Sequence, residues 1–247
     1  MIESSSIWLP LGVALIALVY SLVGHGGASG YLALLAMTSL LPRDVAITAL
    51  LINLVVAGTS FVLYKLARHF SWKLAWPFLL ASGPLAYFGS RLPIAESVYY
   101  WLVGGVLLVS GLRLFWPTTS ATTTETTIFP GVPIRLGTGA GIGLLSGLVG
   151  VGGGIFLSPV LLLARWATAK QTSAVSAIFI VANSLAGLAG RFQQGGTIHS
   201  GTLTLVVAGF VGALAGSYVG AFSIGQRALQ RALAAVLVFA AVKLIFR

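Results

Sequence analysis

The chain has 247 residues, and 57% of them are hydrophobic while only 7% carry a charge. A soluble domain has about a quarter charged residues, so this composition, with its mean hydropathy of +1.01, excludes an ordinary soluble protein and requires a surface that faces lipid. The net charge of +10 comes from 14 Lys and Arg residues against 4 Asp and Glu residues. In a membrane protein such cations anchor helices at the cytoplasmic face and favour anions near the protein, with no need for a nucleic-acid partner.

Apolar stretches follow one another along nearly the whole chain, and a helix of about 20 such residues crosses a bilayer. The opening residues, MIESSSIWLP, contain Glu3 and lack the basic region of a signal peptide, so we expect a membrane segment from Ile7 onward. The full-length candidates are 7–23, 45–64, 74–92, 98–116, 136–150, 171–190, 201–220 and 229–246. Two shorter stretches, 31–41 and 155–164, would span about half a bilayer, and each follows a glycine cluster.

Four pairs of matching segments indicate an internal duplication. Gly24-His25-Gly26-Gly27-Ala28 matches Gly150-Val151-Gly152-Gly153-Gly154 at an offset of 126. The other pairs are AITALLIN ending at Asn53 with SAIFIVAN ending at Asn183, 86–90 with 213–217, and Arg113-Leu114 with Lys243-Leu244. We therefore predict a first membrane repeat over 1–117, a Thr-rich linker over 118–133 and a second membrane repeat over 134–247.

The distribution of cations predicts how the two repeats are oriented. If each glycine cluster turns a hairpin, each repeat has five segments, the second repeat is inverted, and the 14 cations divide nine to five between the two sides. Four segments per repeat would give parallel repeats and a division of eight to six. The positive-inside rule favours the first arrangement. The predicted fold class is an all-α polytopic membrane protein with two inverted repeats, about eight full transmembrane helices and two short half-helices.

The glycine clusters are the first candidate binding elements. Irregular backbone survives inside a bilayer only where it is buried in protein or lines a cavity, and a half-helix that starts there directs free N–H groups and a positive dipole end at the break. This arrangement favours an anion. In the second repeat Ser158-Pro159 fits an N-cap followed by a proline, and Ser29 could cap the first half-helix. The candidate residues in the clusters are Gly24, Gly26, Gly27, Gly150, Gly152, Gly153 and Gly154.

Glycines elsewhere have a purely structural interpretation. Two series recur every four residues, which is the small-residue pattern of tight helix packing in membranes and needs no ligand. They are Gly139, Gly143 and Gly147, and Gly212, Gly216 and Gly220.

Polar side chains inside the apolar segments complete the candidate site. Asn53 and Asn183 occupy duplicated positions, and they either form interhelical hydrogen bonds or orient a polar substrate and hold the glycine loops. His25 lies inside the first cluster, where an ionisable group is a functional candidate that could titrate near neutral pH. Tyr31 and Gln171 are further candidates, whereas His69 and His199 lie in polar loops and are interpreted as interfacial.

The scarcity of other reactive groups excludes several classes. The acids Glu3, Asp44, Glu96 and Glu125 all lie outside the centres of the predicted spans, which argues against a cation channel, a proton pump or an intramembrane protease. The chain has no cysteine and no nucleotide, zinc-protease or serine-nucleophile motif. We therefore expect no catalytic residue, no metal site and no cofactor.

The two glycine clusters, the two asparagines and the Gly-Ser of each half resemble the sulfite exporter TauE/SafE family, over essentially the whole chain. Two departures, Ala28 in place of the last glycine and Ala33 opposite Pro159, make the two loops unequal. The resemblance implies an inner-membrane permease for a small sulfur oxyanion such as sulfite, a sulfonate or sulfoacetate. The expected partners are this anion, the lipid bilayer and, as an open alternative, further copies of the chain. A membrane scaffold or assembly factor that only packs tightly is the alternative function.

Overall fold

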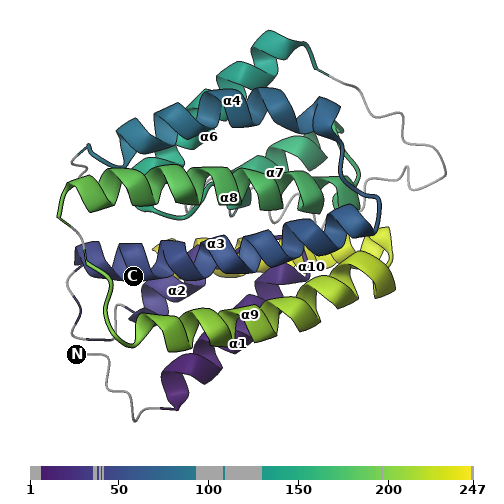
Figure 1. The fold of residues 1–247 in the computed structure, drawn as a ribbon. Helices are drawn as coiled ribbons and strands as arrows, with labels where there is room; N and C mark the ends of the chain where they lie inside the picture. The colour runs from purple at the N-terminus through teal and green to yellow at the C-terminus, as the bar shows by residue number, and fades with distance from the viewer. Residues whose placement is uncertain are drawn as a thin grey trace.

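The computed structural model describes residues 7–35, 38, 40, 42–92, 108, 130–195 and 197–245. All regular elements in these ranges are helices (Figure 1). They are α1 (Trp8–Ser21), α2 (Ala28–Leu35), α3 (Pro42–Leu66), α4 (Trp72–Gly89), α6 (Val132–Val149), α7 (Gly154–Leu163), α8 (Ala169–Gln193), α9 (Thr202–Tyr218), the π-helix η1 (Val219–Ser223) and α10 (Gln226–Ile245). The predicted segment 98–116 lies outside the described residues except for Leu108, and so does most of the linker.

Four of these helices are long and apolar enough to cross a membrane. They cover Asp44–Leu66, Val132–Val149, Ala169–Gln193 and Thr202–Ser223. The predicted span 7–23 is a helix of 14 residues, and α4 carries two internal prolines, Pro77 and Pro84. The chain is therefore an all-helical, multi-pass membrane protein, while the predicted number of eight full spans is not established.

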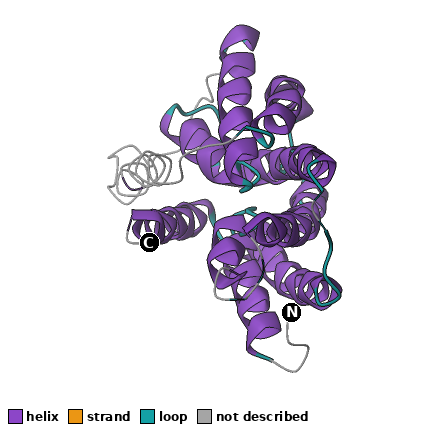
Figure 2. Ribbon diagram, turned by 90° about the vertical axis from the view of Figure 1, so that its left-hand side faces the viewer, coloured by secondary structure: helices purple, strands orange, loops and turns teal. Residues whose placement is uncertain are grey.

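Helices α3 and α8 lie side by side at the centre of the bundle, with α4 and α6 above them and α1 and α9 below in Figure 1. Asn53 of α3 donates a hydrogen bond to Ser184 of α8, and Leu50 lies against Gly187, so the two helices run antiparallel. Figure 2 shows the same layers from the side, with the C-terminal end of α10 along one edge.

The two outer pairs are held by the predicted glycine series. A Cβ on any of these glycines would overlap the backbone of the facing helix, so the helices approach as closely as glycine allows. In α6 and α4 the facing residues are Gly139 and Phe78, Gly143 and Ser82, and Gly147 and Ala86. In α9 and α1 the facing residues are Gly212 and Ala14, and Gly216 and Leu18; the series continues with Gly220 of η1 and Leu22, which follows α1. Both series therefore serve close packing, and the helices of each pair run parallel.

Cations gather at one end of the bundle, which we call the cationic face. It is formed by the C-terminal ends of α3, α7 and η1 and the N-terminal ends of α4, α6, α8 and α10. Arg135 of α6 donates to the carbonyl oxygen of Lys73 in α4, and Lys170 of α8 donates to the carbonyl oxygen of Ala221 in η1. The cations of this face are Lys65, Arg68, Lys73, Arg135, Arg165, Lys170, Arg227 and Arg231.

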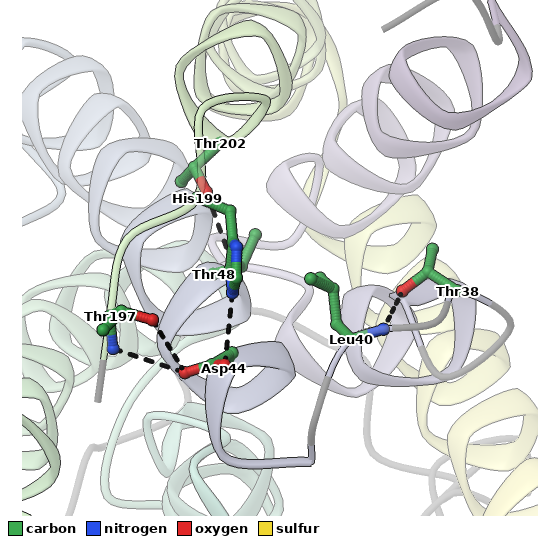
Figure 3. Close-up of polar contacts among 7 residues, drawn as sticks. All are labelled: Thr38, Leu40, Asp44, Thr48, Thr197, His199 and Thr202. Carbon is green, nitrogen blue, oxygen red and sulfur yellow. Dashed lines mark hydrogen bonds and ion pairs between the residues drawn. The ribbon is translucent and has the colours of Figure 1, made fainter. Parts of the chain in front are cut away.

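Asp44 ties the start of α3 to the α8–α9 loop at the opposite end of the bundle (Figure 3). Its Oδ1 atom accepts from the N–H of Thr197 at 3.3 Å and from the Thr197 hydroxyl at 3.4 Å, and its Oδ2 atom lies 3.2 Å from Nε2 of His199. The hydroxyls of Thr48 and Thr202 lie 3.5 Å apart beside them. A carboxylate in the first turn of α3 is also stabilised by the helix dipole. The one acid among the described residues therefore has a structural role and lies away from the centre of the membrane.

Candidate functional site

Each glycine cluster interrupts a helix and starts a half-helix, as the sequence predicts. Between α1 and α2, Gly24 and Gly27 have φ angles of +73° and +90°. At the equivalent positions between α6 and α7, Gly150 and Gly153 have φ angles of +81° and +79°. This left-handed conformation costs about 1–2 kcal/mol for a residue with a Cβ, which explains why glycine stands there.

The predicted caps of the half-helices are wrong. Helix α7 begins at Gly154, so Ser158 and Pro159 lie inside it, and α2 begins at Ala28, so Ser29 is its second residue. The left-handed conformation of Gly153 turns the chain directly into α7, which therefore begins four residues before Ser158. The side chain of Ser158 is therefore free to contact other helices.

Both half-helices start next to the central asparagines. The Ser29 hydroxyl contacts the Tyr20 hydroxyl at 3.1 Å, so α2 folds back along α1. A Cβ on Gly26 would overlap the Oδ1 atom of Asn53, and a Cβ on Gly153 would lie 3.2 Å from Nδ2 of Asn183. The two asparagines lie near the middle of the 25-residue helices α3 and α8. The positive dipole ends of α2 and α7 therefore meet at the centre of the bundle.

The two asparagines make one observed contact each and leave an acceptor unused. Asn53 donates through Nδ2 to Ser184 Oγ at 3.1 Å, and Asn183 donates through Nδ2 to the carbonyl oxygen of Gly152 at 3.4 Å. The second contact holds a glycine loop, which is one of the two predicted roles. Both Oδ1 atoms are buried without a hydrogen-bond partner among the described residues. A buried acceptor of this kind has capacity for a water molecule or for a ligand group that donates a hydrogen bond.

His25 joins the first glycine cluster to the second repeat. The side chain is 2% exposed, and its Nδ1 atom lies 3.0 Å from the carbonyl oxygen of Val23. Its Nε2 atom lies 3.1 Å from Oγ of Ser158 in α7, which in turn lies 2.8 Å from Oγ of Ser176 in α8. Because a carbonyl oxygen only accepts, a neutral ring with its proton on Nδ1 would donate to Val23 and accept from Ser158 through Nε2.

The two clusters share a narrow cleft with room for about one water molecule. Its lining includes the predicted residues His25, Gly26, Gly27 and Ser29 from the first repeat. It also includes residues that the sequence analysis did not select, namely Tyr20, Ala28, Val151, Ile155 and Ile180. Tyr20 could have been found from its position four residues before Gly24, whereas the aliphatic residues have no distinguishing sequence signal.

Four other candidates lie outside the lining of the cleft. A Cβ on Gly24 would overlap the backbone of Ser173 in α8, and one on Gly150 would lie 3.2 Å from Nη2 of Arg191, which donates to the last carbonyl oxygens of α6. Tyr31 is fully buried beside Gly27. Gln171 completes the N-terminal capping box of α8 and has a structural role there.

The histidines of the polar loops do not line the cleft. His69 follows α3 in the loop to α4, where burial and the nearby Lys170 lower the pKa of its ring below the usual value. His199 contacts Asp44. Among the described residues, no group of three or more His, Cys, Asp or Glu could hold a metal ion.

Comparison with known proteins covers nearly the whole chain. Residues 9–244 match the model of the family described as sulfite exporter TauE/SafE. A protein of Sinorhizobium fredii (strain NBRC 101917 / NGR234), named "Probable membrane transporter protein y4hK", is 33% identical over 221 residues. This alignment covers 87% of the chain and 90% of the relative. No solved structure matches.

Proposed function

The chain belongs to the sulfite exporter TauE/SafE family of membrane transporters, and from this premise we propose that it is a secondary exporter of a small sulfur oxyanion in the inner membrane. Sulfite, a sulfonate and sulfoacetate are the proposed substrates. The anion would bind between the two glycine loops near the middle of the membrane. It is a transporter and not an enzyme, and it would use no cofactor.

The observation that carries this proposal is the meeting of two half-helix N-termini at one cleft. The first N–H groups of α2 and α7 have no acceptor within their own helices, and the helix dipoles add positive potential there. Oxygen atoms of a sulfur oxyanion are suitable acceptors for these groups. Asn53 and Asn183, each through the second N–H of its amide, and the Ser158 hydroxyl would complete the shell, with His25 positioned by Ser158. Among the described residues, no carboxylate lies near enough to repel the anion.

The described conformation would be a closed state of the transporter. The cleft holds about one water molecule, and an oxyanion with three or more oxygen atoms needs more space. Opening requires that the α1–α2 hairpin separates from α7 and α8. The contact between His25 and Ser158 crosses this boundary, so it would break and re-form in each transport cycle.

We further propose that the residues 1–117 and 134–247 form inverted repeats. The antiparallel direction of the equivalent helices α3 and α8 supports this arrangement. Two equivalent close contacts also support it. A Cβ on Gly216 would overlap the carbonyl oxygen of Leu18, and a Cβ on Gly89 would overlap that of Leu144, the residue 126 positions after Leu18. The cationic face would then be cytoplasmic by the positive-inside rule.

Single cysteines test this topology directly, because the natural chain contains none. Ser223 is exposed at the cationic face and Ser200 is exposed at the opposite end. In intact cells, an impermeant maleimide is expected to label Ser200→Cys and to label Ser223→Cys only after the membrane is opened. Labelling of both cysteines from the outside would contradict the proposed topology.

Flux through proteoliposomes tests the transport function itself. Vesicles with the purified protein are expected to release radiolabelled sulfite or a sulfonate much faster than protein-free vesicles. Excess unlabelled substrate should compete with the label. Vesicles that contain correctly folded protein but release no oxyanion above the protein-free rate would favour the alternative, a membrane scaffold without transport.

A further inference from the structure

Helices α4 and α6 begin side by side at the cationic face. They run parallel, with Gly139 of α6 packed against Phe78 of α4, so both positive dipole ends lie at the same level. The second residue of α4 is Lys73, and the fourth residue of α6 is Arg135. Two cationic residues therefore lie in the first turns of two adjacent helices, where the helix dipole makes a positive charge unfavourable.

Arg135 is the central group of this arrangement. Its side chain is 6% exposed, and its Nη1 atom donates to the carbonyl oxygen of Lys73 at 2.6 Å. Its Nε atom is buried and has no hydrogen-bond partner among the described residues. A guanidinium remains charged in proteins, so this group needs a further acceptor. The edge formed by Nε and Nη2 has the geometry that binds two oxygens of a phosphate.

The described chain supplies no acid to balance this charge. Its one acid, Asp44, lies at the opposite end of the bundle with Thr197 and His199. A buried cation at two positive helix ends is destabilised by their potential, and an anion close by would stabilise it. An anion at this place would come from outside the described residues.

The surroundings indicate the depth of this place in the membrane. Trp72, the first residue of α4, is 61% exposed. Tryptophan side chains concentrate at the level of the lipid headgroups. Arg135 therefore lies where a phospholipid phosphate is available, and the cytoplasmic leaflet is the one rich in anionic lipids.

We propose that the N-termini of α4 and α6, with Arg135 between them, form a binding site for a phosphate-type anion, and that its occupant is the headgroup of an anionic phospholipid. The site is separate from the oxyanion cleft and does not depend on the transport function. It supplies the charge that the described chain lacks at the start of these two helices.

The test measures lipid binding to the detergent-purified full chain by native mass spectrometry. Phosphatidylglycerol is titrated against phosphatidylcholine, and inorganic phosphate is titrated in a separate arm. We expect phosphatidylglycerol to bind the natural chain more tightly than either of the others. Arg135→Gln should weaken this binding by at least about 10-fold, because a charge-assisted hydrogen-bonded pair is lost. Lys65→Gln removes a charge elsewhere on the same face and should weaken binding by at most about 5-fold, the general effect of one surface cation.

Arg135→Lys keeps the positive charge but lacks the planar edge of the guanidinium. It provides the test if the Arg135→Gln variant does not fold. It should bind phosphatidylglycerol more weakly than the natural chain while retaining a preference over phosphatidylcholine. If Lys65→Gln weakened the binding of phosphatidylglycerol as much as the Arg135 variants do, the proposed site at Arg135 would be wrong. Inorganic phosphate that binds as tightly as phosphatidylglycerol, and depends equally on Arg135, would overturn the lipid as its occupant.

Discussion

Replacing Gly153 or Gly27 with valine is expected to stop oxyanion transport while the protein remains folded. Both residues have left-handed backbone conformations, with φ angles of +79° and +90°. A Cβ on Gly153 would lie 2.8 Å from a ring carbon of Phe179, and one on Gly27 would lie 2.9 Å from the hydroxyl of Tyr31. The half-helix N-termini must therefore shift, and a shift of about 1 Å at a binding site reduces activity by about 100-fold or more.

The fold should survive because the strain at one such residue is about 1–3 kcal/mol, less than the stability of most proteins. Flux in proteoliposomes is measured together with the elution profile and thermal melting of each variant. Gly141→Val is the matched control, since a Cβ on Gly141, in the helix α6 that precedes the second glycine cluster, meets nothing within 4 Å. It should transport at the natural rate. Natural flux in both Gly27→Val and Gly153→Val would exclude the glycine loops as the binding site.

Transport is expected to be electrogenic and to respond strongly to membrane potential. Moving one elementary charge across 100 mV changes the free energy by about 2.3 kcal/mol, so a potential that is negative inside drives anions outward. This corresponds to a gradient of about 50-fold for a monovalent anion and more than about 10³-fold for a divalent one. Radiolabelled efflux from proteoliposomes under a clamped potassium diffusion potential measures the effect. Efflux should rise steeply as the inside is made more negative.

His25→Gln separates this mechanism from obligatory proton coupling. Both ring nitrogens of His25 have observed partners, Val23 and Ser158, so its first role is to hold the cleft together. Glutamine can still make polar contacts but does not titrate, so we expect the variant to change the pH dependence of flux more than the maximal rate. If flux ignored the potential, followed an imposed pH gradient and stopped in His25→Gln, electroneutral proton coupling would replace the electrogenic mechanism.

The sequence was informative where local chemistry decides the structure. Dense glycines cannot continue a helix in a membrane, so the breaks near Gly24 and Gly150 were predictable, and four-residue glycine spacing correctly indicated close packing. The cap at Ser158 was predicted wrongly because an N-cap pattern describes only the residues near it. The left-handed Gly153 started the helix earlier.

Contacts between the two halves of the chain have no signal in the local sequence. Nothing near His25 indicates Ser158 as its partner, 133 residues away, or Asn53 as the partner of Ser184. The cleft residues Ile155 and Ile180 also look like any other apolar residues of a membrane helix. These positions follow from how helices pack in three dimensions and not from local pattern.

The pairing of α1 with α9 has a consequence for how the protein is made. The glycine face that fits α1 begins at Gly212, so the ribosome must add almost the whole remaining chain before α1 meets its partner. At about 5–20 residues per second this interval lasts about 10–40 s. During that time α1, a helix of only 14 residues, has to stay in the nascent membrane assembly without its closest contact. The insertion machinery or the neighbouring early helices must therefore retain it until synthesis is nearly complete.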